Sequence, residues 1–235
     1  GMDQLLERIP DFYPRLAGLR DRLEKVNHRP FTVKVLDFGE VFWTDFGQHL
    51  ALRQNLFALL TEDKRGRLTR ALFNLPEEKD GHGNRIVNST LPDGADIRDS
   101  LIVNAEIRSA DTVIHGGIVI GGTYGRLSMP QGGTAMFCTL GELSLDGPNA
   151  IAFQSILPTL HLPEGGRHAT VITPRGPVQL CTNEAITDYK GTNYTQPLDG
   201  NLLSFDEASM LVEMADPRVL VEIEKQARCT VLEGI

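Results

Sequence analysis

The sequence predicts an α+β protein built around a short left-handed parallel β-helix of the hexapeptide-repeat type. Between residues 86 and 120, aliphatic residues recur at intervals of five or six, which fits neither the helical nor the strand period. Amphipathic helical patterns stand near both ends of the chain. Short apolar stretches separated by Gly and Pro fill the region before the last helices.

These patterns divide the 235-residue chain into four expected segments. We expect an α/β segment at residues 1–80, the hexapeptide β-helix at 81–125, a β-rich segment at 126–203 and helices at 204–235. The acidic, glycine-containing stretch at 77–84 has the composition of a linker between the first two.

The first segment is expected to begin with an amphipathic helix that buries one apolar stripe. The stripe steps by four, three, four and three residues through Phe12, Leu16, Leu19, Leu23 and Val26. Two short strands at 31–35 and 41–42, a helix through residues 52–59 and a shorter helical piece ending at Pro76 follow.

The repeat predicts coils of about 18 residues, in which three short flat strands form a triangle and one aliphatic side chain per strand points to the axis. The recurring residues are Ile97, Ile102, Ile107, Val113 and Val119. We expect Ile97, Ile107 and Val113 to point inside. About two coils are visible, and neighbouring segments must cap their ends.

Beyond Gly122 the pattern fits either further irregular coils or a small antiparallel sheet, with a slight preference for the sheet. The C-terminal helices have clearer start signals. Ser204 with Glu207 forms a capping box ahead of the first, and Asp216 followed by Pro217 opens the second.

Charge and composition exclude several classes of partner. A net charge of -8 repels polyanions, so nucleic acid and anionic membranes are not expected partners. No apolar stretch approaches the roughly 20 residues of a membrane span, and no signal peptide is recognisable, so we expect a cytoplasmic protein. The three cysteines, Cys138, Cys181 and Cys229, lack metal-ligand spacing and fit reduced thiols.

One short motif carries a family resemblance. Residues 42–47, Phe-Trp-Thr-Asp-Phe-Gly, lie between an expected strand and an expected helix. They resemble the Trp-x-Asp-x-Gly element of sugar-1-phosphate nucleotidyltransferases, in which a helix and often a left-handed β-helix follow. The same order recurs across residues 12–120, roughly the first half of the chain.

The resemblance implies that Asp45 ligates Mg²⁺, which neutralises phosphates and aligns the sugar phosphate for attack on the nucleotide. It implies that Gly47 permits a tight turn. The alternative for Asp45 is a helix N-cap, with Trp43 as a buried aromatic residue.

The sequence departs from that family in one important respect. The Gly-rich loop with Arg and Lys that cradles the triphosphate has no counterpart here, because Gly116, Gly117, Gly121 and Gly122 lie inside the repeat. The resemblance therefore implies the C-terminal part of such an enzyme, inactive alone. Mg²⁺, nucleotide and sugar phosphate would bind only when an N-terminal domain completes the site, and no catalytic or cofactor-binding residue is assigned.

Two other functions stay open. His115 is the only histidine in the repeat and would be the general base of a hexapeptide-repeat acyltransferase, although we expect it to be a solvated turn residue isolated from any companion acid. A structural or assembly module, such as a homo-oligomer, is the third possibility. We expect His161 and His168 to be surface histidines of a hairpin. The basic patch of Lys64, Arg65, Arg67 and Arg70 should be a solvated helix face.

Overall fold

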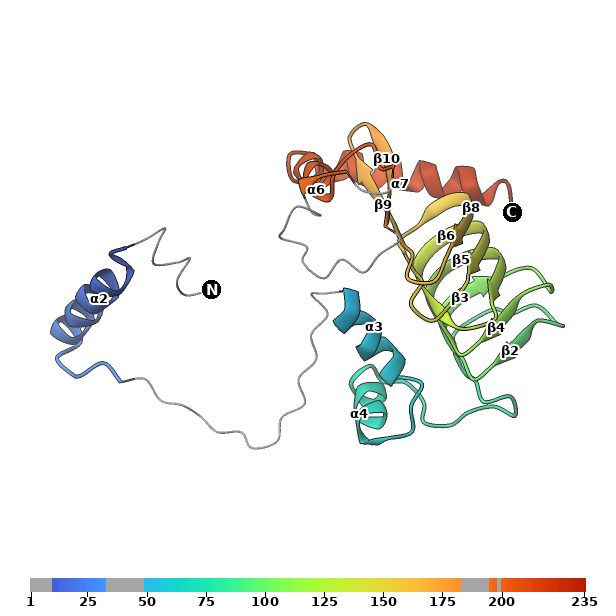
Figure 1. Ribbon diagram of the computed structural model, residues 1–235, viewed down its shortest axis with the longest axis horizontal. Helices are drawn as coiled ribbons and strands as arrows, with labels where there is room; N and C mark the ends of the chain where they lie inside the picture. Colours follow the sequence, from blue (N-terminus) through green and yellow to red (C-terminus); the bar gives the residue numbers. More distant parts are fainter. Residues whose placement is uncertain (1–9, 33–48, 183–194, 198–199) are drawn as a thin grey trace. The chain divides into compact units, whose positions relative to one another are not determined.

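The computed structural model describes residues 10–32, 49–182, 195–197 and 200–235. The chain divides into two compact units, Gly1–Trp43 and Thr44–Ile235. The first contains helix α2 (Phe12–Asn27), and the second contains helices α3 (His49–Ala58), α4 (Lys64–Leu72), α6 (Phe205–Glu213) and α7 (Pro217–Leu232) around a ten-stranded sheet (Figure 1).

The second unit is a parallel β-solenoid. Its strands are β1 (Arg85–Val87), β2 (Asp96–Arg98), β3 (Leu101–Ile107), β4 (Val113–His115), β5 (Gly117–Met129), β6 (Gly133–Leu145), β7 (Ile151–Phe153), β8 (Ile156–Leu162), β9 (Arg167–Thr173) and β10 (Gly176–Thr182). All neighbours pair in parallel except β9 and β10, which form an antiparallel hairpin.

The register of the strand pairs gives the number of residues in each coil. Successive partners along one side of the solenoid are Arg85, Leu101, Ile118, Thr134, Ile151 and Arg167, and about five coils are stacked. Each of these steps is slightly shorter than three hexapeptides would be. The coils also continue past residue 125, since β5 runs from Gly117 to Met129 and β6 and β8 pair in parallel. Among the described strands beyond Gly122, the antiparallel pairing is confined to β9 and β10.

We name the three sides of the solenoid by their strands. The first face contains β1, β7 and the beginnings of β3, β5, β6 and β9; the second contains residues 105–107, 122–124, 138–140 and 156–157; the third contains β2, β4 and residues 126–129, 142–145 and 159–162. Helices α3 and α4 lie beside the first face, and α7 runs along the second (Figure 1).

A left-handed backbone conformation makes the corner between the first and second faces in successive coils. The corner residues with positive φ are Asn88, Asn104, Gly121, Phe137 and Gln154. A small side chain follows each of them: Ser89, Ala105, Gly122, Cys138 and Ser155. Asn and Gly tolerate this conformation, whereas Phe is unusual there. At Gly121 a Cβ atom would come within 2.8 Å of the Phe137 ring, so glycine leaves room for that ring.

The interior of the coils is apolar and largely aliphatic. Ile97 and Ile107 point inside, as the sequence predicts, and are 8% and 1% exposed. The prediction for Val113 is wrong, because Val113 is only half-buried while its neighbours Thr112 and Ile114 are buried. Side chains alternate along a strand, so a one-residue error exchanges inside for outside.

The C-terminal helices begin where the sequence predicts. Ser204 accepts a hydrogen bond from the Glu207 amide and Glu207 accepts one from the Ser204 amide, which is the expected capping box of α6. Asp216 caps α7, with Pro217 at its first position. Within its own unit α2 buries no residue, so the stripe that the sequence predicts to be buried has no partner among the described residues of that unit. The strands expected at 31–35 and 41–42 lie outside the described residues, except for residues 31–32, which are not part of a strand.

Candidate functional site

The motif that carries the family resemblance cannot be placed. Asp45, Trp43 and Gly47 lie outside the described residues, so neither the metal-ligand role nor the helix-cap role of Asp45 is tested by the structure. The helix expected after the motif is present as α3, which begins at His49.

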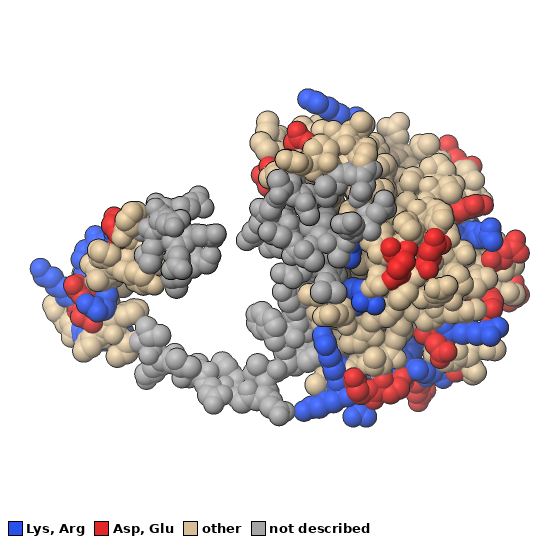
Figure 2. Space-filling view, viewed as in Figure 1, with Lys and Arg blue, Asp and Glu red and all other residues tan. Residues whose placement is uncertain are grey.

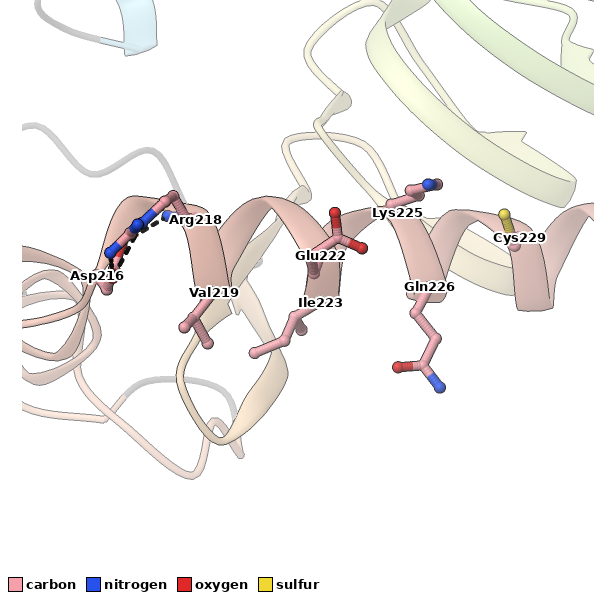
Figure 3. A pocket seen from close by; sticks show the side chains of 8 residues that line it. All are labelled: Asp216, Arg218, Val219, Glu222, Ile223, Lys225, Gln226 and Cys229. Atoms are coloured by element: carbon pink, nitrogen blue, oxygen red, sulfur yellow. Dashed lines mark hydrogen bonds and ion pairs between the residues drawn. The ribbon is translucent and has the colours of Figure 1, made fainter.

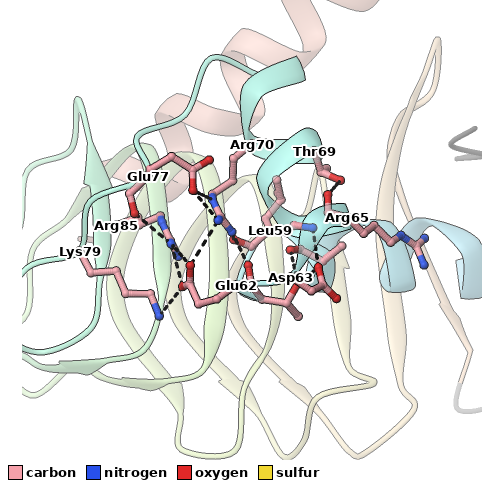
Figure 4. A network of polar contacts seen from close by, with 12 residues as sticks. Leu59, Glu62, Asp63, Arg65, Thr69, Arg70, Glu77, Lys79 and Arg85 are labelled. Carbon is pink, nitrogen blue, oxygen red and sulfur yellow. Dashed lines mark hydrogen bonds and ion pairs between the residues drawn. The ribbon is translucent and has the colours of Figure 1, made fainter. Parts of the chain in front are cut away.

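Part of the basic patch of α4 is exposed to solvent, and part of it belongs to a buried network of polar contacts (Figure 4). Arg67 is exposed, but Arg70 is fully buried, which corrects the expectation of a solvated face. Its guanidinium donates from Nε and Nη2 to Glu77 Oε2, at 3.2 and 2.6 Å, and from Nη1 to the Leu59 carbonyl at 3.0 Å.

Glu62 links the same network to the solenoid. Its carboxylate accepts from Arg85 Nη2, at 2.8 and 3.1 Å, and lies 2.8 Å from Lys79 Nζ. Hydrogen bonds from Lys79 and then Arg85 lower the pKa of Glu62 to about 2. These cations are already matched by carboxylates of the chain, so the network serves to anchor α4 and the stretch after it to β1.

The stretch expected to be a linker is fixed by polar contacts. Asn84 is 3% exposed. Its side-chain amide donates to the Ile97 carbonyl at 2.9 Å and accepts from the Ser100 backbone amide at 3.1 Å. The Asp80 carboxylate accepts from the Asn84 backbone amide at 2.9 Å. Residues 80–84 therefore form the beginning of the first coil.

His115 lies on the third face with a companion acid that sequence reasoning missed. Its Nε2 is 2.9 Å from Asp96 Oδ2, and Asp96 also accepts from Arg98 at 2.7 Å. Hydrogen bonds from His115 first, then Arg98, lower the pKa of Asp96. Ile97 of β2 pairs with Ile114 of β4, which brings Asp96 and His115 together from neighbouring coils. A sequence analysis based on the true coil length would have predicted this proximity. A carboxylate that orients an accessible imidazole is a common arrangement for a general base.

The other two histidines have opposite environments. His161 is exposed and lies 2.7 Å from Asp146, as a surface histidine should. His168 is 3% exposed, so the surface expectation is wrong for it. Its Nδ1 is 2.7 Å from Ser155 Oγ, which is fully buried. Burial lowers the pKa of His168 to about 4. A substrate cannot reach a serine and histidine this deep, so the pair is structural.

An apolar groove lies between α3, the residues that follow α4 and the first face, with a volume of about 410 Å³. Its lining residues are Leu52, Leu56, Leu59, Phe73, Leu75, Val103, Ile120, Met136 and Phe137. Phe137 is 44% exposed at the rim, and its carbonyl accepts two bonds of 3.2 Å from Arg228 of α7. Without charged lining residues the groove suits apolar groups rather than phosphates.

A second hollow follows the outer side of α7 and is shallow (Figure 3). Asp216 and Arg218 are bonded to each other at one end, while Lys225 and the exposed Cys229 lie toward the other. The three cysteines, all among the described residues, form no disulfide, and burial raises the pKa of Cys138. An open helix surface with charges of both signs indicates no particular ligand or reaction.

Within the described ranges no three His, Cys, Asp or Glu side chains gather as metal ligands would. None of the described helices combines the length and apolar character that crossing a bilayer needs.

Fold and contacts together define the chain as a parallel β-solenoid protein with flanking helices. Comparison with protein-family models, curated proteins and solved structures gave no match.

Proposed function

We propose that this chain is a non-catalytic module, the C-terminal part of a sugar-phosphate nucleotidyltransferase. The observation that supports this best is the order of the elements. The Trp-x-Asp-x-Gly element at 43–47 is followed by α3 and α4, and then by parallel coils that begin at Arg85. In this proposal the coils are left-handed and descend from a hexapeptide repeat that has been slightly shortened in each coil.

Asp45 has the chemical role in this proposal. It supplies one carboxylate to Mg²⁺, while a nucleotide-binding domain supplies the triphosphate cradle and at least one further acidic ligand. A single carboxylate holds Mg²⁺ weakly, since the ion keeps its waters unless substrate phosphates replace them. Nucleotide and sugar phosphate therefore bind only to the completed enzyme, and the chain alone does not catalyse nucleotidyl transfer.

The test uses Asp45→Asn in a longer polypeptide that also carries the nucleotide-binding domain. Asn caps a helix about as well as Asp does, so the substitution removes the charge without removing a cap. We expect turnover to fall by at least about a hundredfold, the cost of a misplaced catalytic group, with an unchanged melting temperature. Asp111→Asn, at an exposed turn, is the matched control. Full activity of Asp45→Asn would contradict the proposal and leave Asp45 as a helix cap.

One observation favours a second function, acyl transfer. The carboxylate of Asp96, 2.9 Å from His115 Nε2, would orient the imidazole to deprotonate an acceptor hydroxyl or amine. Turnover of acetyl-CoA with a panel of amino and hydroxy sugars tests this. Activity that is lost in His115→Ala and much reduced in Asp96→Asn, but kept in His161→Ala, would establish acyl transfer in place of the first proposal. No turnover by the parent would exclude this reaction with those acceptors.

A further inference from the structure

A titratable side chain closes an apolar column inside the solenoid. Successive partners along the inner side of the first face are Ile102, Val119, Ala135, Ala152 and His168. The first four belong to the apolar interior, and the last, His168, is 3% exposed. The position where the parallel coils end is therefore occupied by a side chain that can become charged.

The strand that carries His168 is attached unequally to its two neighbours. Strand β9 pairs in parallel with β7 of the preceding coil at three positions. It pairs antiparallel with β10 at seven positions. We call β9 and β10 together the β9–β10 hairpin. Because more of its strand pairing is internal than is made to the coil, the hairpin can separate from the coil as one unit.

Side-chain hydrogen bonds also tie the β9–β10 hairpin to the coil. Thr170 Oγ1 accepts from the Ile156 amide at 2.9 Å and donates to Gln179 Oε1 at 2.7 Å. Gln179 Nε2 donates to the Ile156 carbonyl at 3.4 Å. The contact of His168 Nδ1 with Ser155 Oγ, at 2.7 Å, belongs to the same junction. A change of charge at His168 therefore acts where the hairpin meets the coil.

The side chains around His168 offer no negative charge to an imidazolium. Burial lowers the pKa of His168 to about 4, and the hydrogen bond with Gln179 opposes this only in part. Beyond Ser155 lies Cys138, whose sulfur accepts from the Ser155 amide at 3.4 Å. Burial raises the pKa of this thiol, so it is neutral at pH 7. On β10, Cys181 is the residue opposite His168.

The charged residues of the neighbouring elements do not compensate either. Lys, Arg, Asp and Glu side chains are scattered over the visible surface of the coils (Figure 2). Arg167 precedes His168 and points to the opposite side of β9, and His161 of β8 is exposed. Helices α6 and α7 both contact β9, but none of their ionisable residues contributes to the pKa of His168; the acids among them are Asp206, Glu207, Glu213, Glu222 and Glu224.

We propose that His168 is a pH-sensitive switch whose protonation releases the β9–β10 hairpin from the last coil while the preceding coils stay folded. In the closed state the buried imidazole resists a proton, whereas in the open state it is in water and binds one with its ordinary pKa of about 6.5. Opening therefore becomes more favourable as the pH falls below about 6.5. The proposal concerns which part of the molecule opens, and it is independent of the proposed function.

Hydrogen exchange of the full chain, followed by mass spectrometry at pH 7 and pH 5, tests this. Rates are corrected for the intrinsic exchange rate at each pH. We expect the amides of the β9–β10 hairpin to lose about twentyfold more protection than those of β5 and β6, the factor that follows from a pKa of about 4 closed and about 6.5 open. His168→Gln should remove this extra loss, whereas His161→Gln, at an exposed site, should retain it.

Two results would overturn the proposal. Equal loss of protection in the hairpin and in β5 and β6 would show that acid unfolds the solenoid as a whole. The same extra loss in His168→Gln as in the parent would show that another group is responsible. Ser155→Ala provides a second variant, since Ala105 occupies the same corner position in another coil. It keeps the imidazole and should keep the pH-dependent loss; if that loss disappears, the hydroxyl rather than the charge controls opening, and the proposal is wrong.

Discussion

Single side chains inside the coils carry much of the stability of the solenoid. Ile107 is 1% exposed in a cluster of apolar residues that also contains Ile102 and Tyr124. The cluster contains no cation that would stabilise a carboxylate. The cost of a charge at such a position is large unless the charge is paired.

Ile107→Asp should therefore unfold the protein or reduce its free energy of unfolding by at least about 4 kcal/mol. Thr159→Asp is the control, because Thr159 is an exposed position of β8 beside the buried Leu160. It should change the free energy by less than about 1 kcal/mol. Urea unfolding followed by circular dichroism measures both. Similar midpoints for the two variants would show that Ile107 does not point inside.

His168 makes stability depend on pH. Its pKa is about 4 in the folded protein because of burial, against about 6.5 in an unfolded chain. Between these values the unfolded chain takes up a proton that the folded protein refuses, so the free energy of unfolding falls as the pH falls. From pH 7 to pH 5 the loss due to His168 should be about 2 kcal/mol.

His168→Gln removes this titration while keeping hydrogen-bonding atoms beside Ser155. Its stability should be less sensitive to pH between 7 and 5 than that of the parent, by that amount, whereas His161→Gln, at an exposed site, should follow the parent. Urea midpoints at several pH values provide the comparison. The same pH dependence in His168→Gln and parent would mean that His168 is equally basic in both states.

Among the elements, α4 owes its position to a buried arginine. The side chain of Arg70 is 0% exposed and reaches the Leu59 and Thr61 carbonyls as well as Glu77. Arg70→Ala would leave these acceptors without their donor and should cost about 3 kcal/mol of unfolding free energy. Arg67→Ala, at an exposed position of the same helix, should change it by less than about 0.5 kcal/mol. Equal, small effects would show that α4 does not depend on the network.

Local signals predicted the elements better than long-range ones. The caps of α6 and α7 are short motifs, and both helices begin where Ser204 and Asp216 indicate. The predicted coil of about 18 residues is slightly too long. Each corner has a residue with positive φ followed by a small one, such as Asn104 and Ala105, and these pairs recur slightly sooner than three hexapeptides would place them. Counting in sixes placed Val113 inside, although it lies one position from the buried Ile114.

At the scale of the whole molecule, contacts that form where the chain turns back on itself could not be foreseen from composition. Arg70 belongs to a basic run that looks solvated in the sequence, and Glu77 to a stretch that looks like a linker; they meet only because the chain turns back on itself. Asp96 and His115 meet for the same reason, one coil apart. The role of Asp45 stays a prediction, because it follows from the motif alone.

Calorimetric titration of the chain by itself with nucleoside triphosphates in excess Mg²⁺ tests the central claim most directly. The proposed module lacks a triphosphate cradle, so we predict no saturable heat of binding with any of the common bases, while thermal melting shows that the protein is folded. Saturable binding that requires Mg²⁺, and that is lost in Asp45→Asn, would contradict the account. It would mean that the chain builds a nucleotide site of its own.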